Sequence, residues 1–134
     1  MLKPTYNMNK ERVYDLEERT SNFGSAIIRF VDCLPRTLAG NHMGGQLIRS
    51  GTAPALHYGE SQGAESTRDF IHKVLIALKE LKESRANLRM IKGSGLMPAE
   101  DVEMLQLLQE GNELIKILSK SVSTARKNTV VVKK

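Results

Sequence analysis

The basic residues between positions 82 and 92 form the clearest chemical pattern in this sequence. Spacings of three, four and three residues separate Lys82, Arg85, Arg89 and Lys92, so a helix would place all four on one face. Such a ribbon of positive charge can contact successive phosphates of RNA or DNA, and Arg49 is a further basic candidate. No aromatic residue lies between positions 82 and 92, so base stacking and sequence-specific reading are not indicated. A solvated helix face that only maintains solubility is the alternative interpretation.

Small and polar residues interrupt a second helical pattern, between positions 49 and 60. The run Arg49-Ser50-Gly51-Thr52 precedes His57, Tyr58 and Glu60. Polar groups placed at the cost of helix propensity usually indicate contact with another surface, here a neighbouring helix or another subunit. The candidate structural or interface residues are Ser50, Gly51, Pro54, Glu60, Asp69 and His72.

Enzyme chemistry finds little support in the sequence. The pair Asp69-x-x-His72 puts a carboxylate and an imidazole on one helix face, but a di-iron bundle needs two Glu-x-x-His pairs and two further glutamates. Cys33 lies among apolar residues, which predicts a small buried side chain. Neither a phosphate-binding loop nor a nucleophile elbow is present. We therefore predict no enzyme activity, no cofactor and no metal. The enzyme alternative is a site built from His57, Glu60 and His72.

The composition restricts the class of protein. The chain has 134 residues, 40% of them hydrophobic, one cysteine and a formal net charge of +5. One domain with an ordinary core fits these values, whereas a disordered chain and a disulfide scaffold are excluded. No apolar run approaches the roughly 20 residues that span a bilayer, and no signal peptide is recognisable, so we expect a cytoplasmic protein. Between Glu65 and Lys92, seven basic residues stand against four acidic ones, which concentrates positive charge in that segment.

Helical periodicity accounts for most of the chain. The first helix is expected from about residue 10 until Pro35 stops it. The second, residues 37–61, contains five glycines and Pro54, and we expect it to bend near that proline. The third covers residues 65–91 and ends in the turn Gly93-Ser94-Gly95. The fourth starts at Pro98, a favoured first position.

Apolar residues recur at intervals of three or four in each expected helix, which is typical of a helix with one buried face. Four such helices with short connections favour an all-α, antiparallel up-down-up-down four-helix bundle in residues 10–128. Residues 1–9 and 129–134 are expected to be flexible ends. The expected core positions are Leu16, Phe23, Ile27, Phe30, Val31 and Leu34; Leu38, Met43, Leu47, Ile48, Ala55 and Tyr58; Phe70, Ile71, Val74, Ala77, Leu78, Leu81, Leu88 and Ile91; and Leu105, Leu108, Ile115, Leu118 and Val122.

The second and fourth helices carry more apolar residues than one narrow stripe requires. Met43, Leu47, Leu107 and Leu114 are the examples from which we predict a subunit interface, because extra apolar surface needs a partner to cover it.

The segment from Gln46 to Ser84 resembles a known family. It reads QLIRSGTAPALHYGESQGAESTRDFIHKVLIALKELKES, and its RSGT-x-P and AES-x-x-DFIHK blocks are similar to the signature of the four-helix-bundle family named for the intervening sequences of bacterial 23S rRNA genes. The segment from Asn112 to Asn128 is similar to the end of that family. Arg49, Glu60, Asp69 and His72 match the family pattern, whereas the residues from His57 to Gly59 depart from it.

The resemblance implies four antiparallel helices and a ring of five identical subunits. The family is also similar to the accessory protein of diversity-generating retroelements, a basic pentameric barrel that binds nucleic acid and a reverse transcriptase. We therefore predict a non-enzymatic homopentamer that binds RNA or DNA nonspecifically through its basic surface. A protein-binding adaptor or scaffold with no nucleic-acid role is the alternative.

Overall fold

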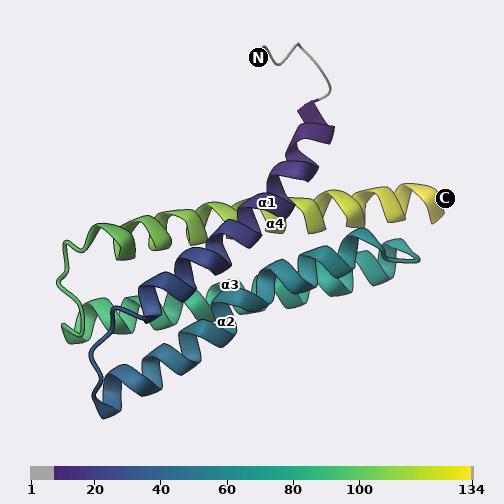
Figure 1. Cartoon of the computed structure of the whole chain (residues 1–134). Helices are drawn as coiled ribbons and strands as arrows, with labels where there is room; N and C mark the ends of the chain where they lie inside the picture. The colour runs from purple at the N-terminus through teal and green to yellow at the C-terminus, as the bar shows by residue number, and fades with distance from the viewer. Residues whose placement is uncertain (1–7, 134) are drawn as a thin grey trace.

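Four α-helices and no strand make up residues 8–133, the part of the backbone that the computed structural model describes; side chains are described for residues 16–128. The helices are α1 (Met8–Val31), α2 (Leu38–Gln62), α3 (Thr67–Ser94) and α4 (Val102–Lys133). Each helix packs against the next one along the chain, and α4 also contacts α1. The α1–α2 and α3–α4 links lie at one end of the bundle and the α2–α3 link at the other (Figure 1). The predicted all-α four-helix bundle is confirmed.

The ends of the bundle differ in detail from the expected boundaries. α1 begins at Met8, and the backbone of α4 remains helical to Lys133, beyond the expected end at residue 128. Residues 1–7 of the expected arm lie outside the described residues, as does residue 134 of the expected tail. The flexibility of both ends stays a prediction.

Side chains cap three of the helices and so define where they begin. The hydroxyl of Thr37 accepts a hydrogen bond from the N–H of Gly40 at 3.1 Å, and Ser66 accepts one from Asp69 at 3.0 Å. The predicted start of α4 at Pro98 is wrong, because Asp101 caps that helix by accepting from the N–H of Met104 at 3.0 Å. Each cap satisfies an N–H that has no partner within its helix.

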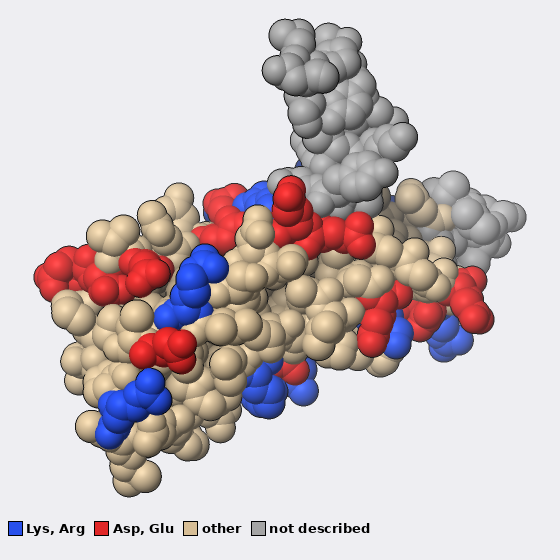
Figure 2. All heavy atoms as spheres, in the orientation of Figure 1, with Lys and Arg blue, Asp and Glu red and all other residues tan. Residues whose placement is uncertain are grey.

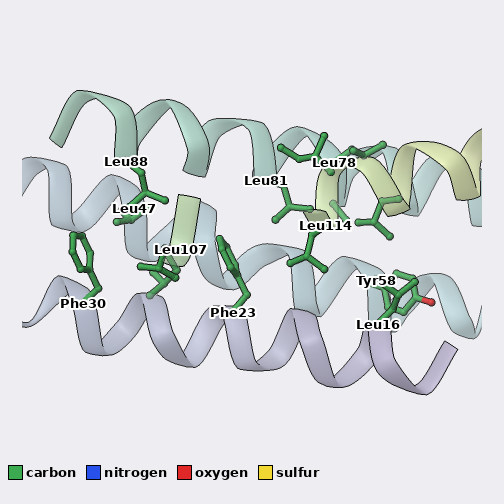
Figure 3. Close-up of a cluster of buried hydrophobic side chains, with 14 of the residues drawn as sticks. Leu16, Phe23, Phe30, Leu47, Tyr58, Leu78, Leu81, Leu88, Leu107 and Leu114 are labelled. Carbon is green, nitrogen blue, oxygen red and sulfur yellow. The ribbon is translucent and has the colours of Figure 1, made fainter. Parts of the chain in front are cut away.

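The core extends along the bundle between the four helices, with Leu16 and Tyr58 towards one end and Phe30 and Leu47 towards the other (Figure 3). Burial and the charge of Glu17 together raise the pKa of the Tyr58 hydroxyl. The expected stripe of α1 is confirmed for its buried members. These are Leu16, Phe23, Ile27, Phe30 and Leu34.

The buried face of α2 consists mainly of small residues, which corrects the expected stripe on that helix. Leu38 is 90% exposed and Ile48 is 38% exposed, although both were expected in the core. α2 continues as an α-helix through the buried Pro54, and the bend at that residue stays a prediction. The residues that α2 does bury are Gly40, Gly44, Leu47, Ser50, Gly51, Pro54, Tyr58 and Ser61.

α1 packs closely against α2 at Gly51. A Cβ atom at Gly51 would lie 2.6 Å from Cγ1 and 2.8 Å from Cγ2 of Ile27, which is fully buried. On the α1 side, a Cβ at Gly24 would lie 3.6 Å from the Gly51 carbonyl oxygen. The absence of a side chain at Gly51 therefore leaves room for Ile27 of α1 against α2.

Gly51→Ala is expected to lower the free energy of unfolding by about 1–3 kcal/mol, because the added methyl group overpacks against the branched side chain of Ile27. The matched control is Gly45→Ala, since Gly45 is exposed on the same helix and a Cβ there meets nothing within 4 Å. That control should raise stability by about 0.5–1 kcal/mol through helix propensity. Urea unfolding of both variants measures the difference. Stabilisation by both substitutions would contradict the close approach of α1 and α2.

The buried face of α4 is shifted by one position from the expected stripe in its first turns. Met104 and Leu107 are buried, whereas Leu105 is 39% exposed and Leu108 is partly buried. Leu47, Leu107 and Leu114 are at most 4% exposed within a single chain. The prediction that these three residues form a subunit interface is therefore wrong, because they belong to the core of the bundle itself.

Candidate nucleic-acid interface

The four residues of the basic ribbon, Lys82, Arg85, Arg89 and Lys92, lie along the side of α3 that faces α4. Arg85 fixes this orientation, because its Nη1 donates a hydrogen bond to Oδ1 of Asn112 on α4 at 3.0 Å. The other three side chains are exposed. Arg85 is partly buried, and the group that accepts its hydrogen bond is a neutral amide.

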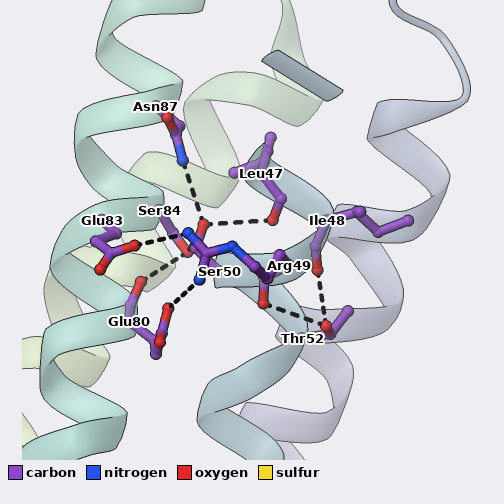
Figure 4. A network of polar contacts seen from close by, with 9 residues as sticks. All are labelled: Leu47, Ile48, Arg49, Ser50, Thr52, Glu80, Glu83, Ser84 and Asn87. Carbon is purple, nitrogen blue, oxygen red and sulfur yellow. Dashed lines mark hydrogen bonds and ion pairs between the residues drawn. The ribbon is translucent and has the colours of Figure 1, made fainter. Parts of the chain in front are cut away.

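The carboxylates nearest to the ribbon along α3 point towards α2. Arg49 of α2 binds both of them, with Nη1 3.3 Å from Oε1 of Glu80 and Nη2 3.0 Å from Oε1 of Glu83 (Figure 4). The hydrogen bond to Glu83 and the charge of Glu80 raise the pKa of Arg49. The structure thus separates Arg49 from the ribbon and pairs it with two carboxylates.

Acidic residues of α4 are likewise directed towards α1. Arg19 donates two hydrogen bonds to Glu110, from Nε at 2.9 Å and from Nη2 at 2.8 Å. Glu103 and Glu110 also line a groove between α1 and α4, together with Arg29. Within the described side chains, no ribbon residue forms an ion pair with a carboxylate. The seam between α3 and α4 therefore keeps its positive charge unneutralised.

Ser50 joins a buried polar network that locks α2 against α3 (Figure 4). Its Oγ lies 3.0 Å from Oγ of Ser84 and accepts from Nδ2 of Asn87 at 3.3 Å. All three residues are at most 8% exposed. Sequence reasoning missed Ser84 and Asn87, although Ser84 continues the spacing of three and four that links the buried residues Leu81 and Leu88. The surface that Ser50 contacts is the adjacent helix of the same chain.

The remaining polar candidates lie near the α2–α3 link and do not form one site. Oε1 of Glu60 lies 3.5 Å from Nδ1 of His57 and 3.5 Å from Nζ of Lys73. Nδ1 of His57 is buried without a hydrogen-bond partner. Asp69 takes part in the first turn of α3 through its N–H. His72 is exposed and forms no hydrogen bond or ion pair with the described side chains, so the grouping of His57, Glu60 and His72 that the enzyme alternative requires is not assembled.

The prediction that Cys33 is buried is wrong. Cys33 lies in the turn after α1 and is exposed, with its Sγ 3.6 Å from the carbonyl oxygen of Arg29, whereas Leu34, the next residue of that turn, takes the buried position. Among the residues described, no group of three or more His, Cys, Asp and Glu side chains could hold a metal ion.

One face of the molecule has mixed charge. Figure 2 shows Lys and Arg interspersed with Asp and Glu and separated by wide neutral areas on the face in view. Such mixing does not favour a ligand of either charge. The basic ribbon differs from this face, because none of its cations forms an ion pair with a carboxylate among the described side chains.

A family model described as 23S rRNA-intervening sequence protein matches residues 12–120. The chain belongs to the 23S rRNA-intervening sequence protein family. The match includes the basic ribbon and the α2–α3 polar network. It confirms the family resemblance seen in the sequence.

A solved structure is similar to this chain. It is the crystal structure, at 1.70 Å resolution, of a protein with unknown function from the S23 ribosomal protein family of Bacteroides thetaiotaomicron VPI-5482. The two chains are 25% identical with a TM-score of 0.73, and the alignment covers 80% of this chain and 97% of the other. No curated protein matches the chain.

Neither the family model nor the description of this crystal structure names an enzyme. A search of the described helices for an apolar stretch long enough to cross a membrane finds none.

Proposed function

We propose that this protein is a non-enzymatic homo-oligomer that binds RNA or DNA through the phosphate backbone, without reading sequence. The observation that carries the proposal is the basic ribbon, whose four cations lie on one helix face with no carboxylate partner among the described side chains. The nearby carboxylates of Glu80, Glu83 and Glu110 form ion pairs with arginines of α1 and α2. Because the cations are not neutralised internally, an external polyanion supplies the missing charge.

The length of the ribbon suits several phosphates of one strand. Lys82 and Lys92 are ten residues apart, which corresponds to about 15 Å along a helix. One strand of a duplex carries a phosphate about every 3.4 Å along the axis, so four cations can each find one within reach. The exposed free thiol of Cys33 also suits a cytoplasmic location, where thiols stay reduced.

Binding through the ribbon is expected to weaken steeply as salt is added. Neutralisation of four phosphates predicts a slope of about −3.6 for log K against log salt concentration, which is a loss of roughly 100-fold between 50 and 200 mM salt. Fluorescence anisotropy with a labelled oligonucleotide of arbitrary sequence measures this slope. Affinity that ignores salt, or no binding at 50 mM, would overturn the proposed function.

The homo-oligomer, which we propose to be a pentamer, rests on apolar side chains that the single chain leaves exposed. Light scattering at micromolar concentration should give about five times the mass of one chain, and a monomer would contradict assembly. Burial of such side chains in a subunit contact removes apolar surface from water. The exposed large apolar residues are Ile28, Leu38, Ile48, Leu56, Leu75, Met90, Val102 and Leu105.

A protein-binding adaptor is the second candidate function. It is favoured by a shallow groove on α3 that includes one ribbon residue and is lined by Leu75, Leu78, Lys79, Lys82, Glu83 and Ala86. Apolar surface of this kind binds protein more readily than phosphate. Recovery of one defined protein partner after nuclease treatment, together with no salt-dependent oligonucleotide binding, would select the adaptor.

A further inference from the structure

The outward side of α2 carries a stripe of uncharged residues along most of its length. Its members recur at intervals of three or four residues, so they share one side of the helix. Ile48 is 38% exposed and Leu56 is 67% exposed, whereas a Cβ atom at Gly45 or Gly59 would meet nothing within 4 Å. Large apolar side chains therefore alternate with places where another backbone can approach closely. The stripe consists of Gly45, Ile48, Thr52, Leu56 and Gly59.

α1 adds a further apolar side chain to the same surface. A Cβ atom at Gly24 of α1 would lie 3.6 Å from Cα of Thr52, so these two residues face each other. Because α1 and α2 are antiparallel (Figure 1), one turn forward from Gly24 and one turn back from Thr52 lead to neighbouring positions. Those positions hold Ile28, which is 47% exposed, and Ile48. We call the α2 stripe together with Ile28 the uncharged face.

The uncharged face can be covered without losing a side-chain hydrogen bond. Oγ1 of Thr52 donates a hydrogen bond to the carbonyl oxygen of Ile48 at 2.7 Å, so that hydroxyl has a partner within its own helix. A buried hydroxyl with such a partner avoids the cost of an unpaired polar group. Exposed apolar surface of this kind marks a site of contact with another protein.

The groove on α3 is a second apolar surface, with a different shape. It has a volume of about 500 Å³, and its apolar lining comes from Leu75, Leu78 and Ala86. Leu75 is 39% exposed, so the groove is open to a side chain from outside. A hollow surface on α3 and projecting side chains on the uncharged face are complementary in shape.

The free charges beside the two surfaces have opposite signs. Lys79 lines the groove and is exposed. Asp32 stands one turn beyond Ile28, to whose carbonyl oxygen its N–H donates at 3.4 Å, and it is also exposed. Neither Lys79 nor Asp32 forms an ion pair with a described side chain. Arg29, the neighbouring base of α1, lines the groove towards α4 instead. This complementarity favours docking of the uncharged face on the α3 groove.

We infer that the copies in the assembly join face to groove, with the uncharged face of one copy on the α3 groove of the next. This inference rests on the proposed function. Contacts of one surface with itself close after two copies, whereas contacts between two different surfaces repeat around a ring. A ring of five identical chains therefore needs two different surfaces on each chain, and the uncharged face and the groove supply them.

Lys82 belongs both to the groove and to the basic ribbon. A lysine can pack its aliphatic stem along apolar surface and keep its ammonium group in water, so docking of the next copy is compatible with phosphate binding. The ribbon then borders each contact between copies and recurs once per chain around the ring.

The test measures the assembly of full-length variants by light scattering at micromolar concentration. Leu56→Glu places a charge on the uncharged face, and Leu75→Glu places one in the groove. The matched control is Val102→Glu on α4, because Val102 is 65% exposed and lies outside both surfaces. All three variants exchange an exposed apolar side chain for the same charge, and circular dichroism checks that each one folds.

The wild type and the control should have the mass of about five chains, whereas the Leu56→Glu and Leu75→Glu variants should each have the mass of one. An equimolar mixture of these two variants should give dimers, because the intact face of the Leu75→Glu chain meets the intact groove of the Leu56→Glu chain. Undiminished assembly of either variant, equal loss in the control, or a mixture that stays monomeric would overturn the face-to-groove contact alone. A monomeric wild type would overturn the proposed homo-oligomer as well.

Discussion

Leu114→Ala is expected to lower the free energy of unfolding by about 2–5 kcal/mol, because the fully buried side chain leaves a cavity that the bundle cannot fill. Leu114 is 0% exposed and lies in the core with Leu81 and Phe23 (Figure 3). The measurement is chemical denaturation of the variant beside the wild type, followed by circular dichroism. A loss of this size is a large part of the 5–15 kcal/mol that stabilises a typical domain.

The matched control is Leu105→Ala on the same helix. Leu105 is 39% exposed, so its truncation removes less buried surface and should cost about 1 kcal/mol or less. The two leucines have opposite roles in the sequence prediction, which placed Leu105 in the core and Leu114 in a subunit interface. A larger loss for Leu105 than for Leu114 would mean that α4 packs on its other face.

Sequence alone predicted the elements whose large apolar residues form one continuous stripe. In α1, the side chains from Leu16 to Phe30 recur with helical spacing and no competing apolar face exists, so the pattern has one solution. In α3, the residues from Val74 to Ile91 behave in the same way. The cap at Thr37 and the left-handed Gly95, with φ of 79°, were recognisable because their local chemistry is specific.

The buried face of α2 was not predictable from hydrophobicity. Contact between helices there depends on close backbone approach, which selects glycine and serine and leaves Ile48 and Leu38 outside. The positions of the large apolar residues in α2 therefore predict the wrong buried face for that helix. The overlap of a Cβ at Gly51 with Ile27 could not be predicted from α2 alone, because Ile27 belongs to α1.

The start of α4 posed a different difficulty, because two apolar stripes overlap. Met104 and Leu107 form one, and Leu105 and Leu108 form the other, with equal spacing. Hydrophobic periodicity does not choose between them, and only the packing of α4 against α1 and α3 does so.

The basic ribbon was predictable because it depends on spacing within a single helix. Its lack of carboxylate partners was not predictable, because Glu80, Glu83 and Glu110 pair with arginines of other helices. Glu83 stands one turn from Lys79 on α3, yet it binds Arg49 of α2 instead. The sequence therefore predicted where the cations lie. The structure shows that the neighbouring carboxylates pair with arginines of other helices.

The basic ribbon is central to the account, and its removal should have the largest effect on binding. Replacing Lys82, Arg85, Arg89 and Lys92 together with glutamine should lower affinity for a labelled nucleic acid by about 100-fold or more at low salt and bring the salt slope close to zero, because no phosphate is neutralised. Glutamine keeps a high helix propensity, so the fold should persist, and thermal melting checks this. The matched control replaces Arg29, Arg36, Arg68 and Lys127 with glutamine, four exposed residues away from the ribbon that carry the same total charge.

The most direct measurement is the oligonucleotide affinity of these two variants beside the wild type, in one buffer at low salt. The account predicts near-complete loss for the ribbon variant and affinity within a few-fold of wild type for the control. Equal losses in the two variants would show that only net charge matters, and undiminished binding by the ribbon variant would contradict the assignment of the α3–α4 seam.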